Sequence, residues 1–225
     1  MEYIHDKNVL KTLIKVIYLI DSKDNYTKKH CENVSRYALL LGKGLGLEKD
    51  DLDIIEIGAM LHDVGKIGIP DYILIKNSSL TYDEFELMKR HVTIGEALLP
   101  NEGYDKIKNM IRSHHERIDG RGYPDGLKGS NIPYFARILS VADAFDAMTT
   151  QRSYNNPKTL DEAFNELLKV SSKQIKNENE FVQQLDSHLV RVFIQLIKND
   201  PEIMQEFKEK DLKIVNSRKN KKNKF

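Results

Sequence analysis

Histidines occupy core-facing positions in a chain whose apolar residues recur with helical spacing from end to end. This spacing predicts helices over most of the 225 residues, whereas strand signals are weak throughout. We therefore expect an all-α fold, a helical bundle. The predicted helices cover about 10–20, 27–43, 50–63, 81–98, a segment that ends at 115, 133–148, 160–170 and 186–198.

Composition limits the classes of protein to which the chain can belong. A hydrophobic share of 40% is ample for a core, and a net charge of +1 favours neither nucleic acid nor an anionic membrane as partner. The single cysteine, Cys31, excludes an internal disulfide and a cysteine-rich zinc site, so a bound metal must take nitrogen and oxygen ligands. No signal peptide is visible, and the apolar run at 16–20 is too short to span a bilayer. We expect a cytoplasmic protein.

Five histidines and two aspartates face the core side of the predicted helices. His30, for example, precedes Val34 by four residues and Tyr37 by seven, which places all three on one helix face. One inward histidine is more often a hydrogen-bonded core residue than a ligand. Seven inward groups without a common partner would cost ~1–3 kcal/mol each if unsatisfied, and a shared metal site removes that cost. The candidate ligands are His30, His62, Asp63, His91, His114, His115 and Asp143.

Seven ligands exceed what one ion needs, and a carboxylate such as Asp63 can bridge two ions. Two ions ~3.5–4 Å apart can hold a hydroxide between them and clamp a phosphate in line with it. Imidazole with carboxylate suits iron, manganese, zinc or nickel, and the residues alone do not choose among them. Lys66 follows His62 by four residues, where its ammonium could reach a phosphate oxygen. His5 and His188 are expected to be ordinary surface residues.

Two segments depart from the helical pattern. Between Glu116 and Pro133 a loop holds Gly120, Gly122, Gly126 and Gly129, and its position after two candidate ligands makes it a candidate substrate-facing wall. Beyond residue 211 the chain has six Lys and Arg and no acid, which predicts a disordered solubilising tail. Weak electrostatic attachment of this tail to nucleic acid or membrane is the alternative.

With these residues placed, the chain resembles the HD-GYP family, the cyclic di-GMP phosphodiesterase branch of the HD phosphohydrolases. The resemblance covers about residues 20–197. Its motifs are LHDVGKIGIPD, MKRHVTIGEALL, IRSHHERIDGRGYPDGLKG and IPYFARILSVADAFDAMTTQRSY. The double histidine followed by Gly122, Tyr123 and Pro124 is far more specific than an HD pair alone. The resemblance implies an all-helical HD domain that hydrolyses cyclic di-GMP.

The resemblance also implies roles for individual residues. His30, His62, Asp63 and Asp143 would hold one metal ion, and Asp63, His91, His114 and His115 would hold the second, with Asp63 as the bridging catalytic ligand. Lys66 and Arg152 would contact the scissile phosphate. The 122–124 segment would border the guanine-binding surface or a partner surface, which could serve a homodimer or a regulatory protein. The two divalent transition-metal ions would be iron or manganese.

Two positions depart from the family pattern. Members with a third metal ion carry a glutamate where this chain has Tyr26, so we expect linear pGpG to accumulate, with GMP formed slowly if at all. A basic residue usually follows the Pro-Tyr after Arg152, whereas this chain has Asn155. Two alternatives therefore stay open: a cyclic di-GMP receptor with little turnover, and an HD phosphohydrolase acting on another nucleotide.

The sequence suggests a division into three parts. Residues 1–20 form an N-terminal helix, which either dimerises or packs on the domain. Residues 21–198 form the HD-GYP phosphohydrolase domain, and residues 199–225 form a helical extension and basic tail.

Overall fold

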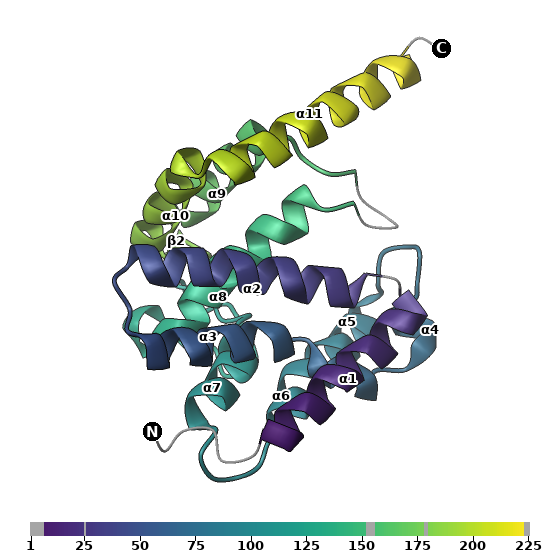
Figure 1. Ribbon diagram of the computed structural model, residues 1–225, viewed down its shortest axis with the longest axis vertical. Helices are drawn as coiled ribbons and strands as arrows, with labels where there is room; N and C mark the ends of the chain where they lie inside the picture. The colour runs from purple at the N-terminus through teal and green to yellow at the C-terminus, as the bar shows by residue number, and fades with distance from the viewer. Residues whose placement is uncertain (1–6, 25, 152–155, 178–179, 223–225) are drawn as a thin grey trace.

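The computed structural model describes residues 7–24, 26–151, 156–177 and 180–222, which form helices joined by loops (Figure 1). The all-α prediction is confirmed, with one antiparallel hairpin added, β1 (Gln174–Asn177) and β2 (Glu180–Val182). Two short 3-10 helices are η1 (Val64–Gly68) and η2 (Gly129–Asn131). The α-helices are α1 (Lys7–Asp24), α2 (Thr27–Gly44), α3 (Lys49–Leu61), α4 (Asp71–Leu74), α5 (Tyr82–Lys89), α6 (His91–Ala97), α7 (Asp105–Ser113), α8 (Tyr134–Thr149), α9 (Leu160–Ser171), α10 (Ser187–Asn199) and α11 (Pro201–Lys222).

Helix α2 lies at the centre of the bundle and contacts α1, α3, α8 and α10 (Figure 1). An aromatic cluster joins it to the C-terminal helices. The Phe145 ring of α8 lies 5.0 Å from the Tyr37 ring, 5.1 Å from Phe193 and 5.4 Å from Phe207, measured between centroids. All four side chains are buried, so aromatic packing stabilises the side of the bundle that supports α2 and α8.

Helix α1 packs onto the domain. Its apolar face buries Leu10, Leu13, Ile17 and Ile20 against the common core. The helix continues to Asp24, so the predicted boundary at residue 20 falls inside α1.

The single helix predicted over 81–98 is wrong, because the structure divides it into α5 and α6 at Arg90. The predicted capping box of Thr81 and Glu84 does begin α5. Helix α5 buries no residue, whereas α6 packs closely on η1. A Cβ atom on Gly65 would collide with the backbone carbonyl of His91. The absence of a side chain at Gly65 therefore allows η1 to pack directly on the backbone of α6.

The predicted disordered tail beyond residue 211 is also wrong, since α11 continues to Lys222 and projects from the body (Figure 1). Two long-range contacts tie it to the start of α9. The Asp211 carboxylate accepts the Leu160 backbone N–H at 3.1 Å, and Arg218 donates to both carboxylate oxygens of Glu162 at 2.7 and 2.9 Å. Lysine and arginine are also good helix formers, so the charge pattern alone was not sufficient to predict disorder.

The β1–β2 hairpin connects α9 to α10, and the residues after it support the glycine-rich loop. The Ile118 N–H donates to the Gln184 carbonyl at 3.0 Å, and the Gln183 N–H donates to the Asp119 carboxylate at 3.0 Å. Within the described residues, no helix combines the length and the apolar character that crossing a bilayer would need.

Candidate metal centre

Three buried histidines stand in the same relation to helix ends. His62 and His114 directly follow the last residues of α3 and α7, and His91 follows the end of α5. Each imidazole pairs through Nδ1 with the carbonyl oxygen three residues earlier, at 2.7 Å for His62, 2.7 Å for His91 and 2.8 Å for His114. The last carbonyls of a helix have no intrahelical donor, so each ring is oriented by the turn that precedes it.

This orientation leaves the opposite ring nitrogens without partners. With Nδ1 as the donor, Nε2 carries the lone pair. The Nε2 atoms of His62, His91 and His114 are buried and find no hydrogen-bond partner among the described residues. An unsatisfied buried polar atom costs ~1–3 kcal/mol, so three together fit a centre built to ligate metal ions.

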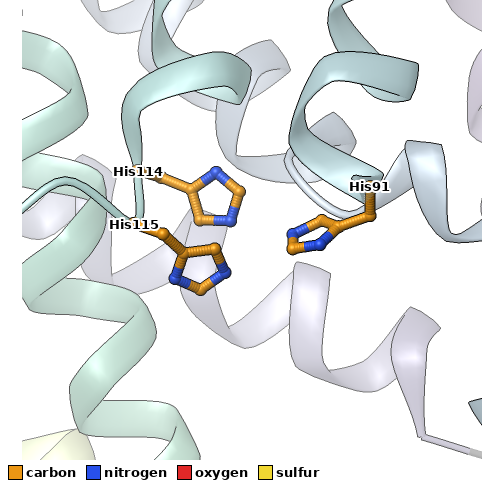
Figure 2. Close-up of side chains that lie close together, drawn as sticks. All are labelled: His91, His114 and His115. Atoms are coloured by element: carbon orange, nitrogen blue, oxygen red, sulfur yellow. The ribbon is translucent and has the colours of Figure 1, made fainter. Parts of the chain in front are cut away.

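The side chains form two groups. Within each group, the candidate ligand atoms all lie within 4.8 Å of one another. One group contains His91, His114 and His115, whose rings point toward a common space (Figure 2). The other contains His30, His62 and Asp63. The His62 and His114 rings, 5.1 Å apart, connect the groups.

Asp63 lies between the two groups. Its Oδ2 atom is 3.5 Å from His62 Nε2 and 3.8 Å from His30 Nε2, and its Oδ1 atom is 3.6 Å from His91 Nε2. Each oxygen thus faces a different group, which is the arrangement that a bridging carboxylate requires. The Lys66 ammonium lies 2.7 Å from Oδ2.

His30 lies between two aspartates of α8. Its Nε2 is 3.1 Å from Asp143, a predicted ligand, and its Nδ1 is 2.7 Å from Asp146. Asp146 is fully buried and also accepts hydrogen bonds from Asn33 and Thr150. This carboxylate was missed by sequence reasoning. It follows Asp143 by three residues, so the helical repeat was the signal that could have found it.

Burial sets the charge of the imidazoles. It lowers the pKa of His62, His91 and His114 and, with the charge of His91, lowers the pKa of His115 to about 3. These rings are neutral near pH 7, which is the form that binds a metal ion.

The pKa values of Asp63 and His30 shift in the direction that favours the charged form of each group. Burial disfavours ionisation of Asp63, but Lys66 and the neighbouring histidines together outweigh it and hold the pKa of Asp63 well below its usual range. Burial also works against a charge on His30, yet Asp143 and Asp146 raise the pKa of His30 to about 9. Metal binding at His30 therefore requires the loss of a proton that it shares with Asp143.

A cavity of about 640 Å³ opens onto this centre. Its described lining includes Tyr26, Lys66 and Tyr123, together with ligand side chains from both groups. The Tyr123 ring stacks on His115 at 4.8 Å, so one member of the predicted 122–124 segment faces the cavity. Pro124 lies exposed at the surface. A Cβ on Gly122 would lie against the backbone of Glu116, and that close approach explains the glycine.

Buried and paired acids hold the glycine-rich loop in place. The Glu116 carboxylate, 3% exposed, accepts the N–H groups of Asp125 and Leu127 at 2.7 and 3.0 Å. Arg112 donates to both oxygens of Asp125, each at 2.7 Å. The loop is therefore an ordered wall beside His115. The sequence analysis predicted no role for Glu116.

The seven predicted ligand positions thus come together, and all of them except His114 line one cavity, with Lys66 beside them. His188 is exposed, as predicted. Arg152 and Asn155, and also His5, lie outside the described residues.

The comparisons with known proteins agree with this geometry. A family model described as HD domain matches residues 15–176. The chain is 38% identical over 196 residues to a cyclic di-GMP phosphodiesterase of Thermotoga maritima, covering 86% of this chain and 50% of that protein. It is 44% identical over 156 residues to the cyclic di-GMP phosphodiesterase response regulator RpfG of Xanthomonas campestris, covering 68% of this chain and 41% of that protein.

A solved structure shares the fold. The cyclic GMP-AMP specific phosphodiesterase V-cGAP3 of Vibrio cholerae aligns with a TM-score of 0.62 at 21% identity, covering 92% of this chain and 53% of that one. The chain spans half or less of the length of the two curated relatives. Residues 62–63 and 122–124 carry the HD and GYP motifs of the branch that the sequence resembles. The chain belongs to the HD domain family.

Proposed function

We propose that the chain is a metal-dependent phosphodiesterase that hydrolyses cyclic di-GMP to linear pGpG. The observation that carries this proposal is a set of three buried Nε2 atoms, those of His62, His91 and His114, which have no hydrogen-bond partner among the described residues. They lie beside a cavity whose described lining includes the predicted ligands Asp63 and Asp143 and the cation Lys66. A structural role for these histidines would leave their polar atoms unsatisfied, whereas a metal centre uses them.

The proposed ligand sets follow the two groups. His30, His62, Asp63 and Asp143 would hold one divalent ion, and Asp63, His91, His114 and His115 the other. Iron or manganese suits this nitrogen and oxygen donor set. When bound, two such ions supply positive charge to a phosphodiester and acidify a water molecule. Asp63 bridges the sets and is the catalytic carboxylate.

The remaining residues of the cavity position the substrate. The Lys66 ammonium, with its side chain 18% exposed, points into the cavity and adds positive charge where a phosphate would lie. We propose that Arg152 is a second phosphate contact and that the segment Gly122, Tyr123 and Pro124 borders the substrate, with Tyr123 stacked beside a base. The exposed side of this loop would receive a second copy of the chain or a regulatory partner.

Tyr26 supports a single cleavage per binding event. Its hydroxyl lies 3.1 Å from His30 Nδ1 and 3.5 Å from Asp146, where a third-metal glutamate would otherwise stand. A neutral phenol is a poor ligand for a divalent ion. We therefore propose pGpG as the accumulating product. The buried free thiol of Cys31 fits the reducing cytoplasm, and residues 21–198 would form the catalytic domain.

One assay tests the proposal. The purified chain, loaded with iron(II) or manganese(II), is offered cyclic di-GMP, 3′3′-cyclic GMP-AMP and cyclic di-AMP, and the products are resolved by chromatography. Hydrolysis of cyclic di-GMP that is lost with a chelator supports the proposal. Tight binding without turnover would favour the receptor alternative, and preference for another nucleotide would favour the second alternative, since V-cGAP3 is named for cyclic GMP-AMP.

A further inference from the structure

A second cavity, of about 440 Å³, lies between α2, the C-terminal end of α8 and α11. No residue of its described lining belongs to the lining of the metal-centre cavity. The volume falls in the range of ~300–1,000 Å³ that is common for small-molecule pockets. The basic end of the chain, which the proposed function does not use, forms one wall.

The described lining of this cavity is cationic. It contains Lys29, Lys210, Lys213 and Arg218, and the described lining includes no acidic side chain. Two of these cations are neutralised by close partners, because Arg218 pairs with Glu162 and Lys210 lies 2.6 Å from Glu206.

The other two cations are available to a ligand. Lys213 is exposed and has no ion pair among the described residues. The Lys29 ammonium is 3.9 Å from Glu32, and its side chain is 71% exposed. An exposed contact at this distance contributes little, so both ammonium groups can turn to an anion. The lining thus favours an anionic ligand.

The remaining lining suits a planar heterocycle. Pro157 and the half-buried Ile214 offer apolar surface, and the side-chain amides of Gln151 and Asn156 can donate and accept hydrogen bonds. Apolar surface with a few polar groups is common in small-molecule pockets, and beside two cations it can take a planar base that carries a phosphate. We propose that this cavity binds a mononucleotide, with the phosphate held by Lys29 and Lys213 and the base lying on Ile214.

The cavity also lies next to Asp146, the buried carboxylate that contacts the predicted ligand His30. Asn33 and Thr150 line it, and both donate to Oδ1 of Asp146, at 2.8 and 2.9 Å. The other oxygen of that carboxylate accepts from His30. Two lining residues and one predicted ligand therefore share a single buried carboxylate.

The experiment measures GMP binding to the full, manganese-loaded chain by calorimetry. Lys213→Glu should weaken binding by about tenfold, the scale of one hydrogen bond to a charged group. Lys208→Glu is the matched control, because it makes the same charge change on the exposed surface of α11 away from the cavity and should leave binding unchanged. Both lysines are exposed, so circular dichroism should show an unaltered fold.

Lys66→Ala separates the two cavities, because Lys66 lines only the metal-centre cavity, where it is the lysine that contacts the predicted ligand Asp63. Binding that survives Lys66→Ala and falls in Lys213→Glu supports the second site, whether or not the chain hydrolyses cyclic di-GMP. Binding that is lost in Lys66→Ala, or that is equal in Lys213→Glu and Lys208→Glu, overturns it. Failure of GMP to bind at millimolar concentration, while an RNA oligonucleotide binds through Lys213, would identify a nucleic-acid surface and would also overturn it.

Discussion

His30 and Asp146 form a buried pair in which the imidazole Nδ1 lies 2.7 Å from the carboxylate, although the two residues are 116 positions apart in the chain. This contact fixes the direction of the ring, because the Nδ1–H donates to the carboxylate and leaves Nε2 available to a metal ion. The negative charge of the carboxylate also raises the basicity of the ring. The other predicted histidine ligands with a hydrogen-bonded Nδ1 use backbone carbonyls instead, so His30 alone among them depends on a charged partner.

Asp146→Ala should therefore weaken metal binding by about 10–100-fold, the usual effect of losing a group that supports a ligand. Thr150→Ala is the control, because it removes one hydrogen bond to Asp146 and leaves the imidazole contact in place. Competition with a metal-sensitive chelator measures both affinities. Equal affinities for Asp146→Ala and the wild type would show that Asp146 does not support His30.

Asp63→Ala should lose more metal than His62→Ala. The carboxylate faces both groups of ligands, whereas His62 belongs to one, and hydrolysis should disappear in both variants. Elemental analysis of the purified proteins, with about two ions per chain expected for the wild type, measures the difference. If Asp63→Ala binds as many metal ions per chain as the wild type, Asp63 does not bridge the two ions.

Lys66→Ala should retain its metal and lose activity by about two orders of magnitude, the scale of removing one charge-stabilising group from an active site. The ammonium contacts Asp63 and borders the cavity, so its loss should leave the fold intact. Turnover and metal content are measured on the same preparation. If Lys66→Ala is demetallated or unfolded, the lysine is structural. Arg152→Ala is expected to lower turnover in a similar way.

A time course of products with excess substrate tests the role of Tyr26. Its hydroxyl lies beside His30 and Asp146, and the family resemblance implies that members with a third metal ion carry a glutamate at this position. Linear pGpG should accumulate because its remaining bond has to be repositioned before a second cut. Prompt release of GMP without a pGpG intermediate would contradict both the two-ion centre and this role.

Gly122→Ala should destabilise the chain by about 1–3 kcal/mol, because the added methyl group meets the backbone of Glu116 and Arg117. Displacement of this loop would also move Tyr123 from His115 and should lower the affinity for substrate. Ser130→Ala, at an exposed position of the same loop, is the control. Chemical unfolding curves and KM values measure the two effects. Identical curves for the two variants would show that the loop adapts without cost.

The helical period predicted most of the bundle, and the capping box of Thr81 and Glu84 marked a real helix start. The local pattern did not predict the break at Arg90, which directly precedes α6, the helix whose backbone packs on Gly65 from a distant part of the chain. Likewise, charge suggested a disordered tail, whereas Arg218 and Asp211 hold α11 to a helix some fifty residues away in the chain.

The residue pattern by itself predicted the chemistry of the candidate site. Inward-facing histidines and aspartates on a helical repeat select nitrogen and oxygen ligation, and their identities and spacing can be read from the chain alone. Only the tertiary structure decided how those groups are oriented and which neighbours support them. The orientation of His62 depends on a helix end, that of His30 on Asp146, and the second cavity on α11 lying beside α8. Contacts between distant segments are set by the packing of whole helices, which a local periodicity does not specify.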